Sequence, residues 1–160
     1  MDFILGTVVL MFILFNFAMM WNGLALRWNL ISQHMQMEAS AYFASESLLA
    51  TPGEPESWEM LGHIDGNVSA LGIVNGRNEL NRLKLDKLVS ENSSAYGTIK
   101  SRLGLEGYEF GMRVTDLQRN EIYYEFGRFS SGSLNNSLDF DRFGVLDGKP
   151  VIIHMEVWGR

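Results

Sequence analysis

Few side chains in this sequence could carry out chemistry, and those few are scattered. The three histidines, His34, His63 and His154, show neither an HExxH motif nor the paired spacing of a metal site. No cysteine occurs, which excludes a disulfide framework, thiolate-bound zinc and cysteine catalysis. A glycine-rich phosphate loop, a nucleophile elbow and a carboxylate pair are likewise missing from the sequence. We therefore expect no catalytic centre and no cofactor, and a structural or binding protein rather than an enzyme.

One group of acidic residues could hold a metal ion. Asp139, Asp141 and Asp147 fall in a short segment, and carboxylate oxygens are the ligands that calcium prefers. The spacing of an EF-hand is absent, and acidic residues near turns are usually solvated. These three aspartates are weak candidates, and the main expectation is that the chain has no metal site.

Three N-x-[ST] sequons begin at Asn67, Asn92 and Asn135. Such sequons can be N-glycosylated where the chain meets a glycosylation machinery. Asn and Ser also favour turns and helix caps for local reasons, so chance occurrence is the competing interpretation. All three lie after residue 50, which favours modification if that part of the chain is extracellular.

The charges are distributed unevenly along the 160 residues, of which 46% are apolar and which carry a net charge of −6. The first 50 residues hold only four charged side chains, Asp2, Arg27, Glu38 and Glu46. Thirteen basic residues against 19 acidic ones argue against nucleic-acid binding, which needs a basic face. The composition therefore indicates an apolar N-terminal segment joined to a polar domain.

The apolar segment Phe3–Leu26 contains 24 residues without a charge, and about 20 apolar residues span the hydrocarbon core of a bilayer. Three interpretations compete. A secretory signal peptide would need a basic start and a small-residue cleavage site, but Asp2 precedes the run and Trp28-Asn29 follows it. The others are a membrane anchor and a helix that leaves the membrane for the apolar core of a protein filament.

The helical pattern continues to Ala50, where Thr51-Pro52-Gly53 ends it. Its length would be about 70 Å at 1.5 Å per residue. Beyond Trp28, apolar residues at helical spacing predict one face that packs on a globular head: Ile31, Met35, Ala39, Tyr42 and Leu49. We expect three regions: an apolar helix at 1–27, its amphipathic continuation at 28–50, and a head at 51–160.

The head should begin with loops at 51–77 and continue with two short helices between residues 78 and 104. Period-two alternation then predicts strands near 108–115, 122–126, 139–146 and 150–158. Asp147-Gly148 is a two-residue hairpin signal. We expect an α+β fold in which the long N-terminal helix covers a four-stranded antiparallel meander. In the last strand Val151, Ile153, Met155 and Val157 should face the helix.

The chain resembles archaeal type IV pilin-like proteins, members of the type IV filament superfamily. The segment ASESLLATPGEPESW at 44–58 is similar to their junction between helix and loop. KLDKL at 84–88, YGTIKSRLGL at 96–105 and the following YEF at 108–110 are looser similarities. Many bacterial relatives carry a glutamate at the fifth mature position, where this chain has Leu5, but archaeal relatives often lack it.

The resemblance implies a pilin that is cut from a short basic leader by a membrane peptidase, a class III signal peptidase. It implies a chain that sits in the cytoplasmic membrane and is then assembled by a platform into an adhesive cell-surface filament. The expected partners are other copies of the chain, joined through their N-terminal helices. The expected filament core consists of Phe3, Ile4, Leu5, Val8, Val9, Leu10, Phe12, Ile13, Leu14, Phe15 and Phe17.

A charged N-terminus would be unfavourable in such an apolar core unless it is paired. If Met1 is the first mature residue, its α-amino group is largely protonated at pH 7. Asp2 is the only carboxylate before Glu38, so it could pair with its own terminus or with that of an adjacent subunit. The competing interpretation is that Asp2 only favours the helix dipole.

Two other functions remain open. A membrane-anchored monomeric extracellular binding module would use the same helix as a simple anchor. An archaellum-type motility subunit would have a head of strands alone, which the two helical patterns between 78 and 104 argue against. The sequence does not separate a major from a minor pilin.

Overall fold

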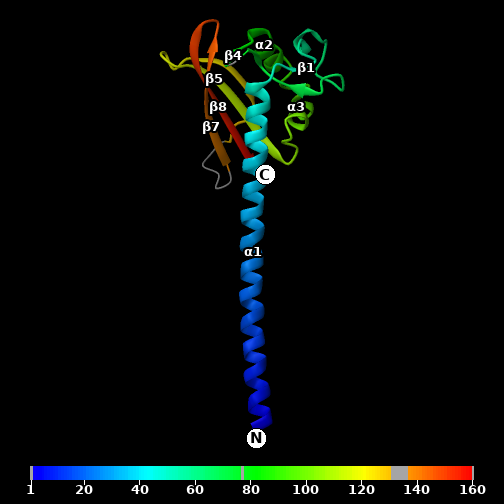
Figure 1. Cartoon of the computed structure of the whole chain (residues 1–160), viewed down its shortest axis with the longest axis vertical. Coiled ribbons are helices and arrows are strands. Elements are labelled where there is room, and N and C mark those ends of the chain that lie inside the picture. The colour runs from blue at the N-terminus through cyan, green and yellow to red at the C-terminus, as the bar shows by residue number, and fades with distance from the viewer. Residues whose placement is uncertain (1, 77, 131–136, 160) are drawn as a thin grey trace. The chain divides into compact units, whose positions relative to one another are not determined.

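The computed structural model describes residues 2–76, 78–130 and 137–159, and the fold is α+β (Figure 1). Met1, the side chain of Asp2 and the sequon residue Asn135 lie outside this part of the chain. The chain divides into two units, Met1–Gln36 and Met37–Arg160. Helix α1 (Asp2–Ala50) runs through the boundary between them. The last turns of α1, from Met37 onward, belong to the core of the second unit.

The first unit is helix alone. The expected helix from Phe3 to Ala50 is confirmed, because α1 covers Asp2–Ala50 without interruption. Gly6 and Gly23 are its weakest helix formers, and each costs about 1 kcal/mol relative to alanine. No proline occurs before Pro52, so every backbone N–H after the first turn can donate along the helix.

The second unit adds two short helices to the end of α1. These are α2 (Arg82–Ser90) and α3 (Tyr96–Arg102), in the region where two helical patterns were predicted. A 3-10 turn, η1 (Trp58–Met60), lies in the segment expected to be loop. The strands are β1 (Gly53–Glu54), β2 (Ala70–Leu71), β3 (Val74–Gly76), β4 (Glu79–Leu80), β5 (Tyr108–Asp116), β6 (Ile122–Gly127), β7 (Ser137–Leu146) and β8 (Lys149–Gly159).

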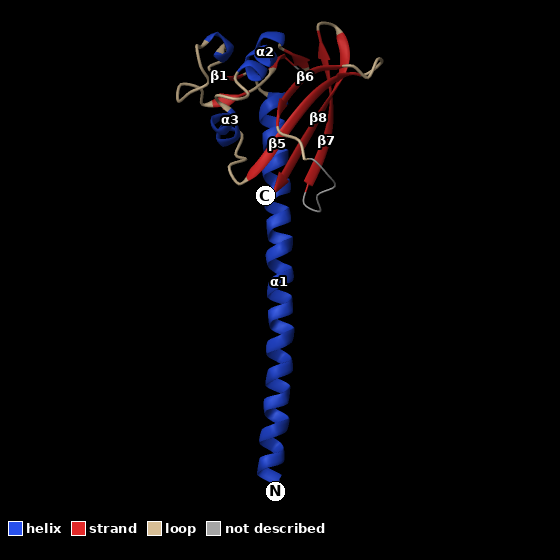
Figure 2. Cartoon of the chain, turned by 180° about the vertical axis from the view of Figure 1, so that it is seen from behind, coloured by secondary structure: helices blue, strands red, loops and turns tan. Residues whose placement is uncertain are grey.

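The prediction of a four-stranded antiparallel meander is wrong. The main sheet has six strands in the order β3-β4-β7-β8-β5-β6, and it is mixed because β4 pairs with β7 in parallel. β1 and β2 form a separate two-stranded ribbon. Figure 2 shows β8 between β7 and β5. The four predicted strands all exist as β5 to β8, but strands of two or three residues such as β3 and β4 have no readable period.

The order of the strands follows from their side chains. β8 buries four alternate apolar residues, Val151, Ile153, Met155 and Val157, and it takes a central place with ladders on both sides. β6 is short and more exposed, and it lies at the edge. The predicted core face of β8 is therefore confirmed, and its residues share one continuous core with the end of α1.

The hairpin between β7 and β8 forms at the predicted dipeptide. Leu146 pairs with Lys149, and the two residues between them have positive φ angles, 51° at Asp147 and 76° at Gly148. This is the backbone that a two-residue turn of the type I′ class requires. It sets the register of the longest pair of strands in the sheet.

The predicted packing face of α1 is wrong. Ile31, Met35, Ala39 and Tyr42 are exposed and Leu49 is only partly buried. The buried side of the helix, at spacings of four, three, one and three, is Met37, Ala41, Ala44, Ser45 and Leu48. Three of these five buried residues are small, so the large apolar side chains that marked the predicted face do not mark the buried one. A prediction based only on the large apolar residues of α1 therefore chose the wrong side of the helix.

The chain that follows α1 is held tightly against the end of the helix. The N–H of Ile73 donates to the carbonyl of Leu48 at 2.8 Å, and the indole of Trp58 donates to the carbonyl of Gly72 at 2.9 Å. Gly72 allows this approach, because a Cβ there would lie 1.8 Å from the carbonyl oxygen of Thr51. The buried Lys84 ammonium donates to the carbonyl of Pro52 at 2.6 Å, and burial lowers its pKa.

Adjacent isoleucines on β8 provide a matched test of the core face. Ile153 is buried, whereas Ile152 points to the other side of the sheet and is partly exposed. We expect Ile153→Ala to lower the free energy of unfolding by about 2–5 kcal/mol, because it opens a cavity in the core. Ile152→Ala should cost clearly less. Denaturant melts of the full chain in detergent micelles measure both, and equal losses would show that the assigned core face is wrong.

Candidate functional site

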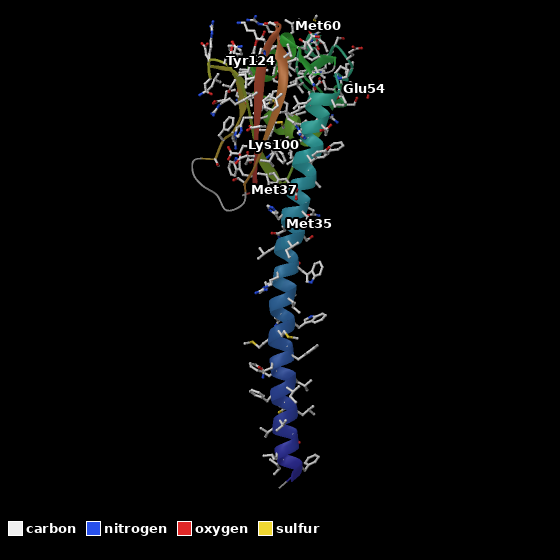
Figure 3. All side chains as sticks on the ribbon, turned by 60° about the vertical axis from the view of Figure 1, so that its left-hand side comes forward. Met35, Met37, Glu54, Met60, Lys100 and Tyr124 are labelled. Atoms are coloured by element: carbon white, nitrogen blue, oxygen red, sulfur yellow. The ribbon has the colours of Figure 1, made fainter. Side chains whose placement is uncertain are left out.

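The largest candidate site is the surface of α1 in the first unit. The side chains of residues 3–26 surround the helix on every side (Figure 3). All are exposed apart from Thr7, which is partly so, and Phe3 reaches 86% exposure. By length and composition this is the one helix in the described residues that could cross a membrane. The eleven residues predicted for the filament core, from Phe3 to Phe17, all lie on this surface.

Two polar side chains within the apolar run are satisfied locally. The hydroxyl of Thr7 donates to the carbonyl of Phe3 at 2.9 Å, and the amide of Asn16 donates to the carbonyl of Phe12 at 2.8 Å. A polar group without a partner is costly in hydrocarbon. These bonds within the helix lower that cost, so the two residues are compatible with an apolar environment.

The histidines and the candidate metal ligands do not form one site. His34 is exposed on α1. His154 lies across the β7–β8 ladder, with Nδ1 2.8 Å from Asp141 and Nε2 3.8 Å from Asp139. Asp147 instead pairs with Arg82 at 3.2 Å, roughly 20 Å along β7 from Asp141 at about 3.3 Å per residue. Within the described ranges no cluster of three or more His, Asp or Glu side chains could hold a metal ion.

His63 belongs to a polar cluster around Glu91. The carboxylate of Glu91 accepts from Ser94 at 2.8 Å, lies 3.2 Å from Lys87 and 3.1 Å from His63. The hydrogen bond from Ser94, followed by that from Lys87, lowers the pKa of Glu91. This arrangement joins the end of α2 to the loop at residue 63, so its function is structural.

The two described sequons differ in their surroundings. Asn67 is exposed in a turn, with its N–H bonded to Asp65 at 2.9 Å. Asn92 is partly buried, and its side-chain oxygen accepts the N–H of Gly127 on β6 at 3.0 Å. The Asn92 side chain therefore helps to position β6. Asn67 is the more accessible of the two for glycosylation.

The alternation in β5 indicated that one face of the strand is exposed to water. Part of that face is buried instead. Glu109 on that strand is buried, and its carboxylate lies 3.2 Å from Lys100 and 2.9 Å from the hydroxyl of Tyr96. Arg128 lies 3.6 Å away on the exposed side. Burial raises the pKa of Tyr96 to about 12, so its hydroxyl stays protonated and can donate to Glu109. An ion pair at the start of β5 thus fixes α3 to the sheet.

Asp116, at the end of β5, organises the turn that leads to β6. Its carboxylate accepts from the hydroxyl of Tyr123 at 2.5 Å and from the N–H groups of Gln118 and Arg119 at 2.7 and 2.9 Å. The bond from Tyr123, followed by the two backbone bonds, lowers the pKa of Asp116 to about 2. The carboxylate is therefore ionised in all but strong acid, and it holds Tyr123 in place.

A cleft of about 280 Å³ opens beside Tyr123, and sequence reasoning missed it entirely. It is lined by Arg82, Tyr123, Tyr124, Leu146, Asp147 and Lys149. The sequence predicted strands at 122–126 and 139–146, a hairpin at 147–148 and a weak metal ligand at Asp147, but none of these signals placed the lining residues together. The lining residues come from separate parts of the sequence, so their proximity depends on the order of the strands.

Comparison with known proteins gives no identity. No family model matches the chain, and neither a curated protein nor a solved structure is detectably similar to it. A long apolar N-terminal helix whose end packs on a sheet is compatible with a pilin-like architecture.

The low pKa of Asp116 predicts how stability depends on acid. The carboxylate has an ordinary pKa of about 3.9 when unfolded, so its contribution is complete above about pH 4 and disappears as the pH falls toward 2. We expect the melting temperature of the full chain to fall from pH 4 to pH 2. In Asp116→Asn and in Tyr123→Phe, which removes the main cause of the shift, the fall should be smaller. Thermal melts followed by near-ultraviolet circular dichroism test this, and unchanged slopes would contradict it.

The two described sequons should respond differently to substitution in protein purified from cells that glycosylate it. Asn67→Gln should lower the mass by one glycan, because this side chain is exposed. Asn92→Gln should leave the mass unchanged and lower the melting temperature, since Gln places its oxygen one carbon farther from Gly127. Intact-mass spectrometry and thermal melts distinguish the two. A glycan lost from Asn92→Gln and not from Asn67→Gln would reverse the assignment.

Proposed function

We propose that this chain is a structural subunit of an archaeal type IV pilus-like filament at the cell surface, with a function in adhesion. It would be inserted in the cytoplasmic membrane first and then assembled with other copies through their N-terminal helices. A membrane peptidase and an assembly platform are the partners that this proposal requires. The proposal involves assembly rather than catalysis, and it includes no nucleic acid.

The observation that carries the proposal is the apolar surface around the whole of α1 from Phe3 to Leu26. A helix that is apolar on every side is stable only in a membrane or inside a protein core. Burying one large apolar side chain contributes about 1.5–3 kcal/mol relative to water. Relative to lipid the gain is smaller, so close packing between helices has to provide the selectivity.

The length of the exposed apolar surface supports a filament over a simple anchor. About 20 residues are enough to cross a hydrocarbon core of about 30 Å. Exposed apolar side chains continue past Arg27 and past that length, at Trp28, Leu30, Ile31 and Met35. In a simple anchor these apolar side chains would remain exposed to water, whereas neighbouring helices in a filament would bury them.

A membrane-anchored monomeric binding module is the second candidate function. The cleft beside Tyr123 favours it, because a head that binds a ligand needs no filament to do so. The two functions differ in where the intact protein is found. Sheared from cells, a filament subunit appears in ordered filaments, while an anchored monomer stays in the membrane fraction.

Two leucines with the same exposure provide the test. Leu10 and Leu83 are each 56% exposed in the single chain, but only Leu10 lies in the apolar run. We expect Leu10→Lys to abolish or strongly reduce sheared filaments, because a lysine costs about 2.5–3.5 kcal/mol at the centre of a membrane helix. Leu83→Lys on α2 should assemble normally.

Filament yield is measured by electron microscopy of the sheared fraction, at matched amounts of protein in the membrane. Membrane levels have to be checked first, since a loss of insertion would mimic a loss of assembly. Normal filaments from Leu10→Lys would refute a buried position for this residue. Wild-type protein found only as monomers in the membrane fraction would favour the binding module.

A further inference from the structure

The cleft beside Tyr123 is built where three elements meet in the head. Arg82 is the first residue of α2, Tyr123 and Tyr124 lie on the edge strand β6, and Asp147 and Lys149 come from the β7–β8 hairpin. Its volume of about 280 Å³ is near the lower limit for small-molecule sites. That space suits one sugar ring rather than a long chain.

An irregularity in the sheet places two consecutive tyrosines in this one cleft. Successive side chains of a regular strand point to opposite faces. Here Val114 pairs with Tyr124 while the next residue, Thr115, pairs with Ile122, so Tyr123 is an extra residue in the ladder. Bulges of this kind redirect side chains and are common beside functional sites. Both aromatic rings therefore line the same space.

Hydrogen bonds donated by their hydroxyl groups fix the positions of the two tyrosine rings. Tyr123 donates to Asp116 at 2.5 Å, and Tyr124 donates to Asp86 on α2 at 2.9 Å. Each ring is thus fixed by a carboxylate from another element. Rings fixed in this way are ready to stack on a ligand without a further cost in side-chain entropy.

Within the part of the chain that the structure describes, Lys149 is the cation of the cleft that has no ion pair, while the carboxylates of Asp116 and Asp86 lie beyond the two tyrosine hydroxyls. Arg82 is neutralised by Asp147 at 3.2 Å. Lys149 is exposed and lies 5.9 Å from the centre of the Tyr123 ring. Among the described residues it has no carboxylate within 4 Å. An ammonium group beside an aromatic ring is thus free to meet an anion.

We propose that this cleft binds a pyranose sugar that carries a carboxylate, such as a uronic acid at the end of a surface glycan. The C–H face of the ring would stack on the tyrosines, whose faces carry partial negative charge. The carboxylate would pair with Lys149, and the sugar hydroxyls would meet the Arg82–Asp147 pair. The inference deepens the adhesive function proposed above by naming the ligand, but it does not depend on filament assembly.

The test uses the full chain as monomers in detergent micelles, titrated with a glucuronate-terminated disaccharide and with its neutral glucose counterpart by isothermal calorimetry. We expect saturable binding of the glucuronate and at least about tenfold weaker binding of the neutral sugar. Lys149→Gln should weaken glucuronate binding by about tenfold or more, as expected for a charge-assisted hydrogen bond. Arg102→Gln removes one positive charge from α3, outside the residues that line the cleft, and it should have no effect.

The aromatic contribution is tested with two variants at one position. Tyr123→Phe and Tyr123→Leu both lose the bond to Asp116, but only the first keeps a ring. Binding should survive in Tyr123→Phe and fall by about threefold or more in Tyr123→Leu. The proposal is overturned by an absence of glucuronate binding, by equal affinity for the neutral sugar, or by an affinity that Lys149→Gln leaves unchanged. Because assembly is not measured, none of these outcomes bears on the filament.

Discussion

The fold depends on one constraint: a single helix has to satisfy two different environments along its length. From Phe3 to Leu26 it is apolar on all sides and needs lipid or other helices. From Met37 to Leu48 it buries one narrow side in the head. The small residues Ala41, Ala44 and Ser45 are buried on that side, and Gly72 lets the following chain fold back against Thr51. The sheet and short helices of the head complete this core.

Charged groups inside the head stabilise its geometry because each has partners. Glu109 is buried but is paired with Lys100 and bonded to Tyr96, which joins α3 to the sheet. Lys84 is buried with a bond to the carbonyl of Pro52 and fixes the segment after α1. A buried charge without a partner would cost several kcal/mol. These pairs therefore specify how the short helices dock rather than adding much net stability.

The two proposed functions of the chain are carried by separate surfaces. In these proposals the apolar helix would provide assembly, and the cleft in the head would provide recognition. The cleft owes its chemistry to an edge strand with an extra residue, to a hairpin and to the start of α2. Its residues are held by Asp116 and Asp86, so the binding surface is fixed by the same hydrogen bonds that stabilise the head.

Local sequence patterns were enough to predict the helix from residue 3 to 50, the four long strands, the hairpin at Asp147-Gly148 and the core face of β8. These features have local causes: a long apolar run, period-two alternation and a dipeptide that tolerates positive φ. The tertiary structure alone decided the strand order, the parallel pairing of β4 with β7, the packing side of α1 and the cleft. Those depend on which distant segments pair and on which side of each element they cover. Local periodicity contains neither kind of information, because it reports which side of an element is apolar and not what will cover it.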